Sequence, residues 1–213
     1  MKKALTNRWT RAALFVLCLV PLAWLGWRAY QQQLTANPIE FITHFTGDWT
    51  IRFLLITLSV TPLRKLFALP QLARYRRMLG LFAFFYGCLH MLTWLWLDKF
   101  FDPSEMWKDV VKRRFITAGM TAFLLILPLA ITSTAGWVRR LGFVKWQRLH
   151  RLIYFSALAA VIHYYWLVKS DIRLPLMYAS IWAVLMLYRL GVWLRAQPKP
   201  KRVTIPSTAS LQD

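Results

Sequence analysis

Three of the four histidines in this sequence, His90, His150 and His163, lie inside long apolar stretches. An ionisable ring inside a lipid bilayer is energetically costly, so each of the three is a candidate functional residue. A neutral imidazole is a ligand of haem iron, and histidines on two different helices can occupy both axial positions of one b-type haem. The placement of these histidines therefore points to haem chemistry inside a membrane.

The apolar stretches that carry the histidines have the length of membrane helices. The sequence has 213 residues, of which 58% are hydrophobic, and its mean hydropathy is +0.40. About 20 consecutive apolar residues are enough to cross a bilayer as a helix. The second predicted span is the weakest, because it contains Arg52 and Pro62. The pattern predicts an all-α integral membrane protein, a six-transmembrane-helix bundle with spans at 12–30, 50–67, 78–97, 115–134, 150–168 and 174–194.

The basic residues predict how this bundle is oriented. The net charge is +20, and 19 of the 28 Lys and Arg residues, with only one of the eight acidic residues, fall on the same side as the N-terminus. Lys and Arg in short loops mark the cytoplasmic side, so both termini are predicted to be cytoplasmic. This distribution accounts for the charge without a nucleic-acid partner. Membrane lipid is the expected partner of the basic amphipathic segment at 137–149.

The chain is expected to contain one domain. Residues 1–195 hold the six spans, and residues 196–213 are polar, without periodicity and rich in proline, so they are predicted to be a disordered cytoplasmic tail. No Gly-x-Gly-x-x-Gly sequence opens a nucleotide-binding unit, so electrons are not expected to come from a nicotinamide domain of this chain.

His90 and His163 are predicted to lie at the same depth in the bundle. His90 follows Met78, the inner end of its span, by 12 residues, and His163 follows His150 by 13. At 1.5 Å per residue, both lie roughly 18 to 20 Å from the inner surface. Small residues also serve ordinary helix packing, but here they cluster where a macrocycle would need room: Gly87, Ser156, Ala157, Ala159 and Ala160.

His150 has no histidine partner at its own depth, because Arg76 and Arg77 occupy that level of the third span. It is predicted either to ligate a second haem or to bind a haem propionate, a flavin or a quinone headgroup. Nearby arginines can bind the same anionic groups through charge-assisted hydrogen bonds, or can simply anchor the cytoplasmic side. The candidates are Arg74, Arg76, Arg77 and Arg148.

His44 and the two cysteines carry weaker signals. His44 lies outside the predicted spans and is interpreted either as a structural histidine in a loop or as a quinone or partner contact. Cys18 and Cys88 lie in different spans, without the Cys-x-x-Cys-His sequence that attaches haem covalently, so a haem is expected to be non-covalent. The leading hypothesis is an electron conduit across the membrane. A histidine-relay, proton-coupled transporter and a purely structural anchor are the alternatives.

Several short motifs together resemble the MsrQ family, formerly called YedZ, within the ferric-reductase-like transmembrane superfamily. The resemblance implies a six-span haem subunit of the bacterial inner membrane that passes electrons to MsrP, a periplasmic molybdopterin enzyme that reduces methionine sulfoxide in oxidised proteins. The motifs are His44-Phe45-Thr46-Gly47, Thr61-Pro62-Leu63, Arg76-Arg77-Met78-Leu79-Gly80-Leu81, His90, Thr132-Ser133-Thr134, Trp146-Gln147-Arg148-Leu149-His150 and His163-Tyr164.

The resemblance also implies the cofactors and the electron donor. Haem b and FMN are associated with the family, the donor is the quinone pool or a cytosolic flavin reductase, and sulfoxide reduction takes place outside this chain. His90 and His163 match haem ligands, and His150 matches a ligand or a second-cofactor residue. Related oxidases carry two histidines on each of two helices. This sequence departs from that pattern at Arg76 and Arg77, which argues against an inner bis-histidine haem and leaves room for a flavin.

Overall fold

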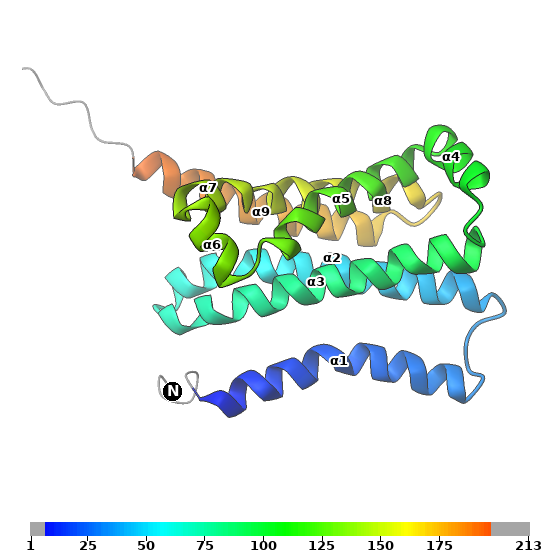
Figure 1. The fold of residues 1–213 in the computed structure, drawn as a ribbon, viewed down its shortest axis with the longest axis horizontal. Coiled ribbons are helices and arrows are strands. Elements are labelled where there is room, and N and C mark those ends of the chain that lie inside the picture. Colours follow the sequence, from blue (N-terminus) through cyan, green and yellow to red (C-terminus); the bar gives the residue numbers. More distant parts are fainter. Residues whose placement is uncertain (1–6, 197–213) are drawn as a thin grey trace, which may run out of the picture.

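The computed structural model describes residues 7–196, and the regular elements in this range are all helical. The predicted all-α fold class is therefore confirmed for the described part of the chain. The predicted tail at 196–213, apart from its first residue, lies outside the described residues. The elements, most of them labelled in Figure 1, are α1 (Arg8–Tyr30), α2 (Pro38–Leu66), the 3-10 helix η2 (Pro70–Tyr75), α3 (Arg76–Leu92), the π-helix η3 (Thr93–Asp98), α4 (Pro103–Lys112), α5 (Arg114–Ile131), α6 (Ala135–Leu141), α7 (Phe143–Leu149), α8 (Leu152–Leu167) and α9 (Arg173–Arg195).

Within the described residues, four helical stretches are long and apolar enough to cross a membrane. They are α1, α5, α9 and the run Pro70–Asp98, which includes α3. The other two predicted spans correspond to α2 and α8. The α8 helix has only 16 residues, which is shorter than the roughly 20 that a hydrocarbon core requires. The α2 helix has 29 residues but includes Asp48 and Arg52. Because α2 packs against α3, α8 and α9, it is enclosed by protein and does not need a uniformly apolar surface.

Short polar residues cap the first turns of α1, α2, α4 and α6. Asn37 caps α2, because its side-chain oxygen accepts the Glu40 N–H at 3.3 Å while its amide donates to the Glu40 carboxylate at 3.1 Å. Pro38 takes the first helical position, where a missing N–H costs nothing because the first N–H groups of a helix have no partner within it. The helix that contains the second predicted span therefore begins well before residue 50, and it continues through Pro62 to Leu66.

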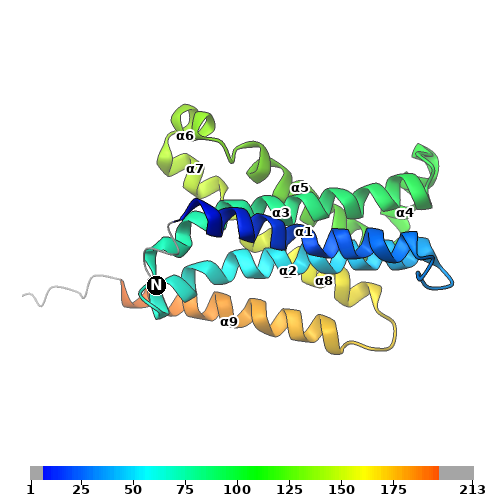
Figure 2. The ribbon, with the colours of Figure 1, turned by 90° about the horizontal axis from the view of Figure 1, so that it is seen from below.

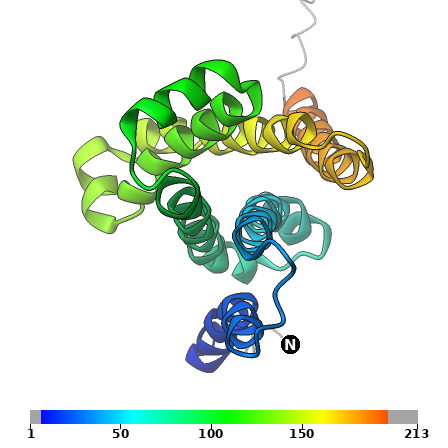
Figure 3. The same ribbon diagram turned by 90° about the vertical axis from the view of Figure 1, so that its right-hand side faces the viewer.

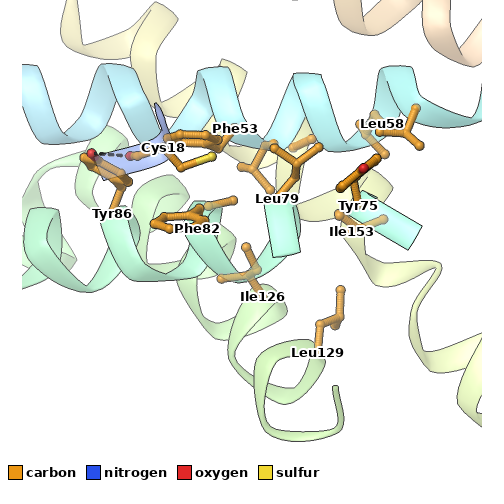
Figure 4. Packing of buried hydrophobic residues seen from close by; sticks show 14 of the residues in the cluster. Cys18, Phe53, Leu58, Tyr75, Leu79, Phe82, Tyr86, Ile126, Leu129 and Ile153 are labelled. Carbon is orange, nitrogen blue, oxygen red and sulfur yellow. Dashed lines mark hydrogen bonds between the residues drawn. The ribbon is translucent and has the colours of Figure 1, made fainter. Parts of the chain in front are cut away.

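One buried hydroxyl attaches α1 to the rest of the bundle. Tyr86 of α3 is fully buried and reaches the turn of α1 that Pro21 interrupts. Leu22 N–H donates to the Tyr86 hydroxyl at 3.2 Å, and that hydroxyl donates to the Cys18 carbonyl at 3.0 Å (Figure 4). The hydroxyl is thus inserted between a donor and an acceptor that would otherwise bond to each other, which is a recognised cause of helix bending.

Two antiparallel helix pairs form the centre of the molecule. The α2–α3 pair packs against the α5–α8 pair, with α9 on one flank and α1 on the other side of α2 and α3 (Figures 1 and 3). Phe53, Phe82, Ile126 and Ile153, one from each of these four helices, meet in the main core (Figure 4). The short helices α6 and α7 lie at one end of the bundle and α4 at the other (Figure 2).

The predicted amphipathic segment at 137–149 falls in two short helices. Gly142 separates α6 from α7 with a φ of +75°, a left-handed conformation that favours glycine. His150 is the C-cap of α7, and α8 begins only at Leu152. His150 and His163 therefore do not share one uninterrupted helix, which corrects the predicted start of the fifth span at residue 150.

Candidate functional site

His90 of α3 and His163 of α8 lie next to each other inside the bundle. Their ring centroids are 5.9 Å apart, and the ring planes are inclined by 74°. Both residues are partly buried and come from helices that run in separate pairs. The structure therefore brings together the two histidines that the sequence placed at one depth.

Each of these rings is held by a backbone carbonyl of a neighbouring helix. Nδ1 of His90 lies 2.9 Å from the carbonyl oxygen of Thr43, and Nδ1 of His163 lies 2.6 Å from that of Phe115. A carbonyl oxygen can only accept, so each Nδ1 carries the proton and donates it. Each neutral ring keeps the lone pair on Nε2 for a ligand, an arrangement typical of metal-binding histidines.

Two glycines make room for the rings. A Cβ added at Gly119 would lie 2.7 Å from Nδ1 of His163, and one at Gly47 would lie 3.0 Å from Cε1 of His90. Real Cβ atoms rarely come this close to a side chain, because atoms at such distances repel each other strongly. The backbones of α5 and α2 approach the two imidazoles this closely because both positions lack a side chain.

A cavity of about 570 Å³ surrounds the two rings. It is bordered by α2, α3, α5 and α8, and its size falls in the range of pockets that hold small molecules and cofactors. Of the small residues that the sequence singled out, Gly87, Ser156 and Ala160 line the cavity. Ala157 instead belongs to the packed core. Ser156 donates its hydroxyl hydrogen to the Ala122 carbonyl at 2.8 Å, so it is a satisfied part of the wall.

The residues of the cavity fit a haem with two histidine ligands. A bond between an imidazole nitrogen and a metal ion is about 2.0 Å long, so two opposed rings that share one ion have centroids about 6 Å apart. The observed separation is 5.9 Å. Across residues 7–196, no group of three or more His, Cys, Asp or Glu residues could hold a metal ion. The pair suits an iron whose remaining ligands come from a macrocycle.

The rim of the cavity is polar. Glu40, His44, Asp98 and Arg113 line it where α2 begins, η3 ends and α5 begins. His44 lies within α2, so its interpretation as a loop histidine is wrong. Helix α2 begins at Pro38, earlier than the apolar pattern indicated, and this brings His44 to the cavity.

An ion-pair network fastens Arg113 to helix α4. Asp109, which is buried on α4, lies 3.2 Å from Nε of Arg113 and 2.7 Å from Nζ of Lys99. The hydrogen bond that Lys99 donates to Asp109 raises the pKa of the Lys99 ammonium group. A buried carboxylate without a partner is costly, so Asp109 is expected to stay paired with these cations. The network therefore positions a basic side chain at the cavity rim.

His150 and the predicted arginines lie elsewhere. The His150 ring stacks on Trp146 with centroids 4.0 Å apart, and Nδ1 of His150 donates to the Trp146 carbonyl at 3.0 Å. The described residues that line the histidine cavity do not include His150 or any of the four predicted arginines, Arg74, Arg76, Arg77 and Arg148. Arg77 borders a second groove, beside Trp146.

Comparison with known proteins assigns the family of the chain. The family described as ferric reductase like transmembrane component matches residues 46–161, a segment that includes His90 and His150 and ends just before His163. A relative from Herminiimonas arsenicoxydans, the protein-methionine-sulfoxide reductase heme-binding subunit MsrQ, is 54% identical over 182 residues, 84% of each chain. The chain belongs to the MsrQ family.

Further MsrQ relatives cover as much of the chain or more. The heme-binding subunit MsrQ of Caulobacter vibrioides is 49% identical over 179 residues, 84% of each chain. That of Xanthomonas campestris pv. campestris is 47% identical over 215 residues, 98% of each chain. The resemblance to the MsrQ family is thus confirmed. Together with the apolar helices, membership of this transmembrane family makes the chain a multi-pass membrane protein.

Several parts of the MsrQ-family site escaped sequence reasoning. The carbonyls of Thr43 and Phe115 have no sequence signal, because every residue carries a carbonyl. Gly47 and Gly119 had a weak signal, since glycine disfavours helices and often marks a close approach inside one. Arg113 is missed because only the fold of α4 brings it to the cavity rim.

Proposed function

We propose that this MsrQ-family chain is a haem-binding, electron-transferring membrane subunit of a methionine-sulfoxide reductase. The His90–His163 pair carries the proposal, because two neighbouring imidazoles that donate their Nδ1 protons keep Nε2 for a metal and would together hold one haem b. The description of the relatives as heme-binding subunits supports it. A bound haem b supplies a one-electron carrier between a donor and an acceptor.

The surrounding residues hold and orient such a group. His90 and His163 would ligate the iron through Nε2, while the Thr43 and Phe115 carbonyls fix the ring orientation and raise the basicity of the ligand nitrogens. Apolar side chains such as Leu54, Phe123 and Ile126 line the cavity and would pack against the macrocycle. Arg113 at the rim would bind a propionate through charge-assisted hydrogen bonds.

We further propose that the chain lies in the bacterial inner membrane as one domain, residues 1–195, with six spans and both termini cytoplasmic. The two spans beyond the four apolar stretches are α2 and α8. The concentration of Lys and Arg on one side supports this orientation. The cavity rim and α4 then face the periplasm, on the side of an MsrP-like molybdopterin partner. His44 at the rim is the proposed quinone or partner contact.

The proposed electron donor is the quinone pool or a cytosolic flavin reductase. One haem near the outer end does not bridge a hydrocarbon core of about 30 Å, so we propose a second carrier near His150. It would be a second haem or FMN, whose anionic groups Arg74, Arg76 and Arg148 would bind. Support comes from the position of His150, the C-cap of α7, at the opposite end of the bundle (Figure 2).

A reduced-minus-oxidised absorbance spectrum of the purified protein tests the central proposal. The wild type should show b-type haem bands, and His90→Ala and His163→Ala should each lose them. His44→Ala is the matched control, because it removes a histidine from the same cavity without removing a proposed ligand. A colourless wild type, or full bands in both ligand variants, would contradict the proposal and favour the histidine-relay transporter or the structural anchor.

The partner is tested separately. The reduced protein should be reoxidised by the purified periplasmic molybdopterin subunit in the presence of methionine sulfoxide, and only slowly by either alone. Stopped-flow absorbance at the haem band measures this rate. Equal rates with and without the catalytic subunit would contradict the proposed partner.

A further inference from the structure

A second groove lies at the end of the bundle opposite α4. It has a volume of about 470 Å³ and lies between α3, the end of α5 and the α6–α7 pair. Its lining residues include Arg77, Arg139, Ser133, Thr134, Val138 and Trp146.

Two arginines from distant parts of the sequence border this groove without a counter-charge. Arg77 lies in the first turn of α3 and Arg139 lies on α6. No Asp or Glu lines the groove, and neither arginine forms an ion pair with another residue in the range that the structure describes. Two guanidinium groups beside one concave surface favour an anion between them. The groove therefore has the charge of an anion-binding site.

The donors of the groove suit the oxygens of a phosphate. A guanidinium group offers several N–H donors in a planar fork that matches phosphate oxygens. The Thr134 hydroxyl accepts the Trp137 N–H at 3.4 Å, which leaves its own proton available. The Ser133 hydroxyl instead donates to the Leu129 carbonyl at 2.6 Å, so it contributes only an acceptor. The available donors are therefore the two arginines and Thr134.

Apolar side chains beside the groove indicate that the phosphate belongs to a lipid. Trp146 forms part of the wall and is held in place by a hydrogen bond from Nε1 to the Thr132 carbonyl at 2.9 Å. Phe143 stacks on Trp146 with centroids 6.3 Å apart, yet 62% of Phe143 and 60% of Val144 are exposed. Exposed apolar groups next to basic ones are typical of a segment that lies in the headgroup layer of an anionic membrane.

We propose that this groove binds the phosphate group of an anionic phospholipid. Arg77 and Arg139 contact the phosphate oxygens, and the acyl chains lie beside Phe143 and Val144. Trp146 connects this site to the proposed inner carrier, because it lines the groove and also stacks on His150. A bound lipid therefore restrains α7 and with it the His150 ring. The lipid site itself does not depend on the proposed haem function.

Thermal melting of the full-length, delipidated protein in a neutral detergent tests the proposal. Phosphatidylglycerol in mixed micelles should raise the melting temperature more than phosphatidylcholine does. The double variant Arg77→Gln/Arg139→Gln should weaken the apparent affinity for phosphatidylglycerol at least tenfold. The matched control, Arg11→Gln/Arg140→Gln, removes the same charge at the same end of the bundle, outside the groove, and should retain the wild-type affinity.

Two results would overturn the proposal. Unchanged affinity in the double variant, or an equal loss in the control, would show that the groove is not the site. Inorganic phosphate and glycerol 3-phosphate form the second arm: if they stabilise the protein at the same concentration as phosphatidylglycerol, the ligand is a soluble phosphate and not a lipid.

A second pair of variants covers the case in which the double variant does not fold. Arg77→Lys and Arg139→Lys keep the charge but lose the two-point contact with phosphate oxygens. Each should weaken phosphatidylglycerol binding about threefold to fivefold, measured by native mass spectrometry of bound lipid. Unchanged lipid binding in both variants would overturn the proposal.

Discussion

The paired histidines at one end of the bundle and the single histidine at the other differ in their hydrogen-bond partners and in the space around their rings. His90 and His163 donate Nδ1 protons to carbonyls of other helices and lie next to each other beside a cavity. His150 donates to a carbonyl one turn earlier in its own helix, and its ring lies against Trp146. A histidine in the bundle is thus suited to bind a ligand when the surrounding backbone both orients its ring and leaves a cavity beside it.

The charge around the two regions differs as well. Beside His150, the groove that Trp146 lines carries Arg77 and Arg139. The histidine cavity has Asp48, Asp98 and Glu40 near its rim together with Arg113. The end of the bundle at α6 and α7 therefore suits anions, while the end near α4 suits a metal-centred group with two neutral nitrogen ligands.

The largest expected difference between the two regions is in the loss of haem when one histidine of each is replaced by alanine. His163→Ala is expected to lower haem affinity by at least about 100-fold, because losing a ligand exceeds the 10-fold to 100-fold cost of losing a ligand's hydrogen-bond partner. His150→Ala should leave the haem of the outer pair in place. A pyridine haemochrome assay of haem per protein measures both. Equal losses in the two variants would remove the distinction between the regions.

Filling the space at Gly119 should be the next largest effect. The new Cβ in Gly119→Ala would lie 2.7 Å from Nδ1 of His163, which displaces the ring from the Phe115 carbonyl. We expect haem affinity to fall about 10-fold to 100-fold, measured by haem titration of the depleted protein. Gly26→Ala is the matched control, because nothing lies within 4 Å of a Cβ there. Unchanged haem affinity in Gly119→Ala would show that the short distance between α5 and the His163 ring does not matter for haem binding.

A smaller effect is expected at Gly47. A Cβ there would meet Cε1 of His90 at 3.0 Å, so the ring must shift by a few tenths of an ångström. Gly47→Ala should change the electron paramagnetic resonance g-values of the oxidised haem and weaken haem binding less than Gly119→Ala does. Gly80→Ala should change neither, since Gly80 does not line the cavity and its Cβ would make an ordinary contact of 3.6 Å with Thr57. A larger loss of haem binding in Gly47→Ala than in Gly119→Ala would be inconsistent with the two Cβ distances.

The smallest expected effect is at the inner end. Trp146→Phe removes the hydrogen bond from Nε1 to the Thr132 carbonyl, which should lower the free energy of unfolding by about 1 kcal/mol. Denaturant titration in detergent measures the change, and the haem of the outer pair should stay bound. Loss of that haem in Trp146→Phe would show that the two regions are coupled.

The fixed geometry of the α-helix explains both why the sequence correctly pairs His90 with His163 and why it misplaces His44. The rise per residue of an α-helix is fixed, so counting along two regular helices places His90 and His163 at one level. The argument needs the correct helix ends, and the cap at Asn37 followed by Pro38 lies in polar sequence outside the apolar run. His44 was therefore assigned outside the helix that carries it to the cavity rim.

The sequence by itself determined the all-helical class, the apolar stretches and the histidines that could pair, because these follow from local composition and helical periodicity. The tertiary structure decided which residues surround those histidines. The carbonyls of Thr43 and Phe115, the open space at Gly47 and Gly119, and Arg113 at the rim all depend on contacts between helices far apart in the chain. Such contacts arise from the packing of whole helices, whose relative placement no local pattern encodes.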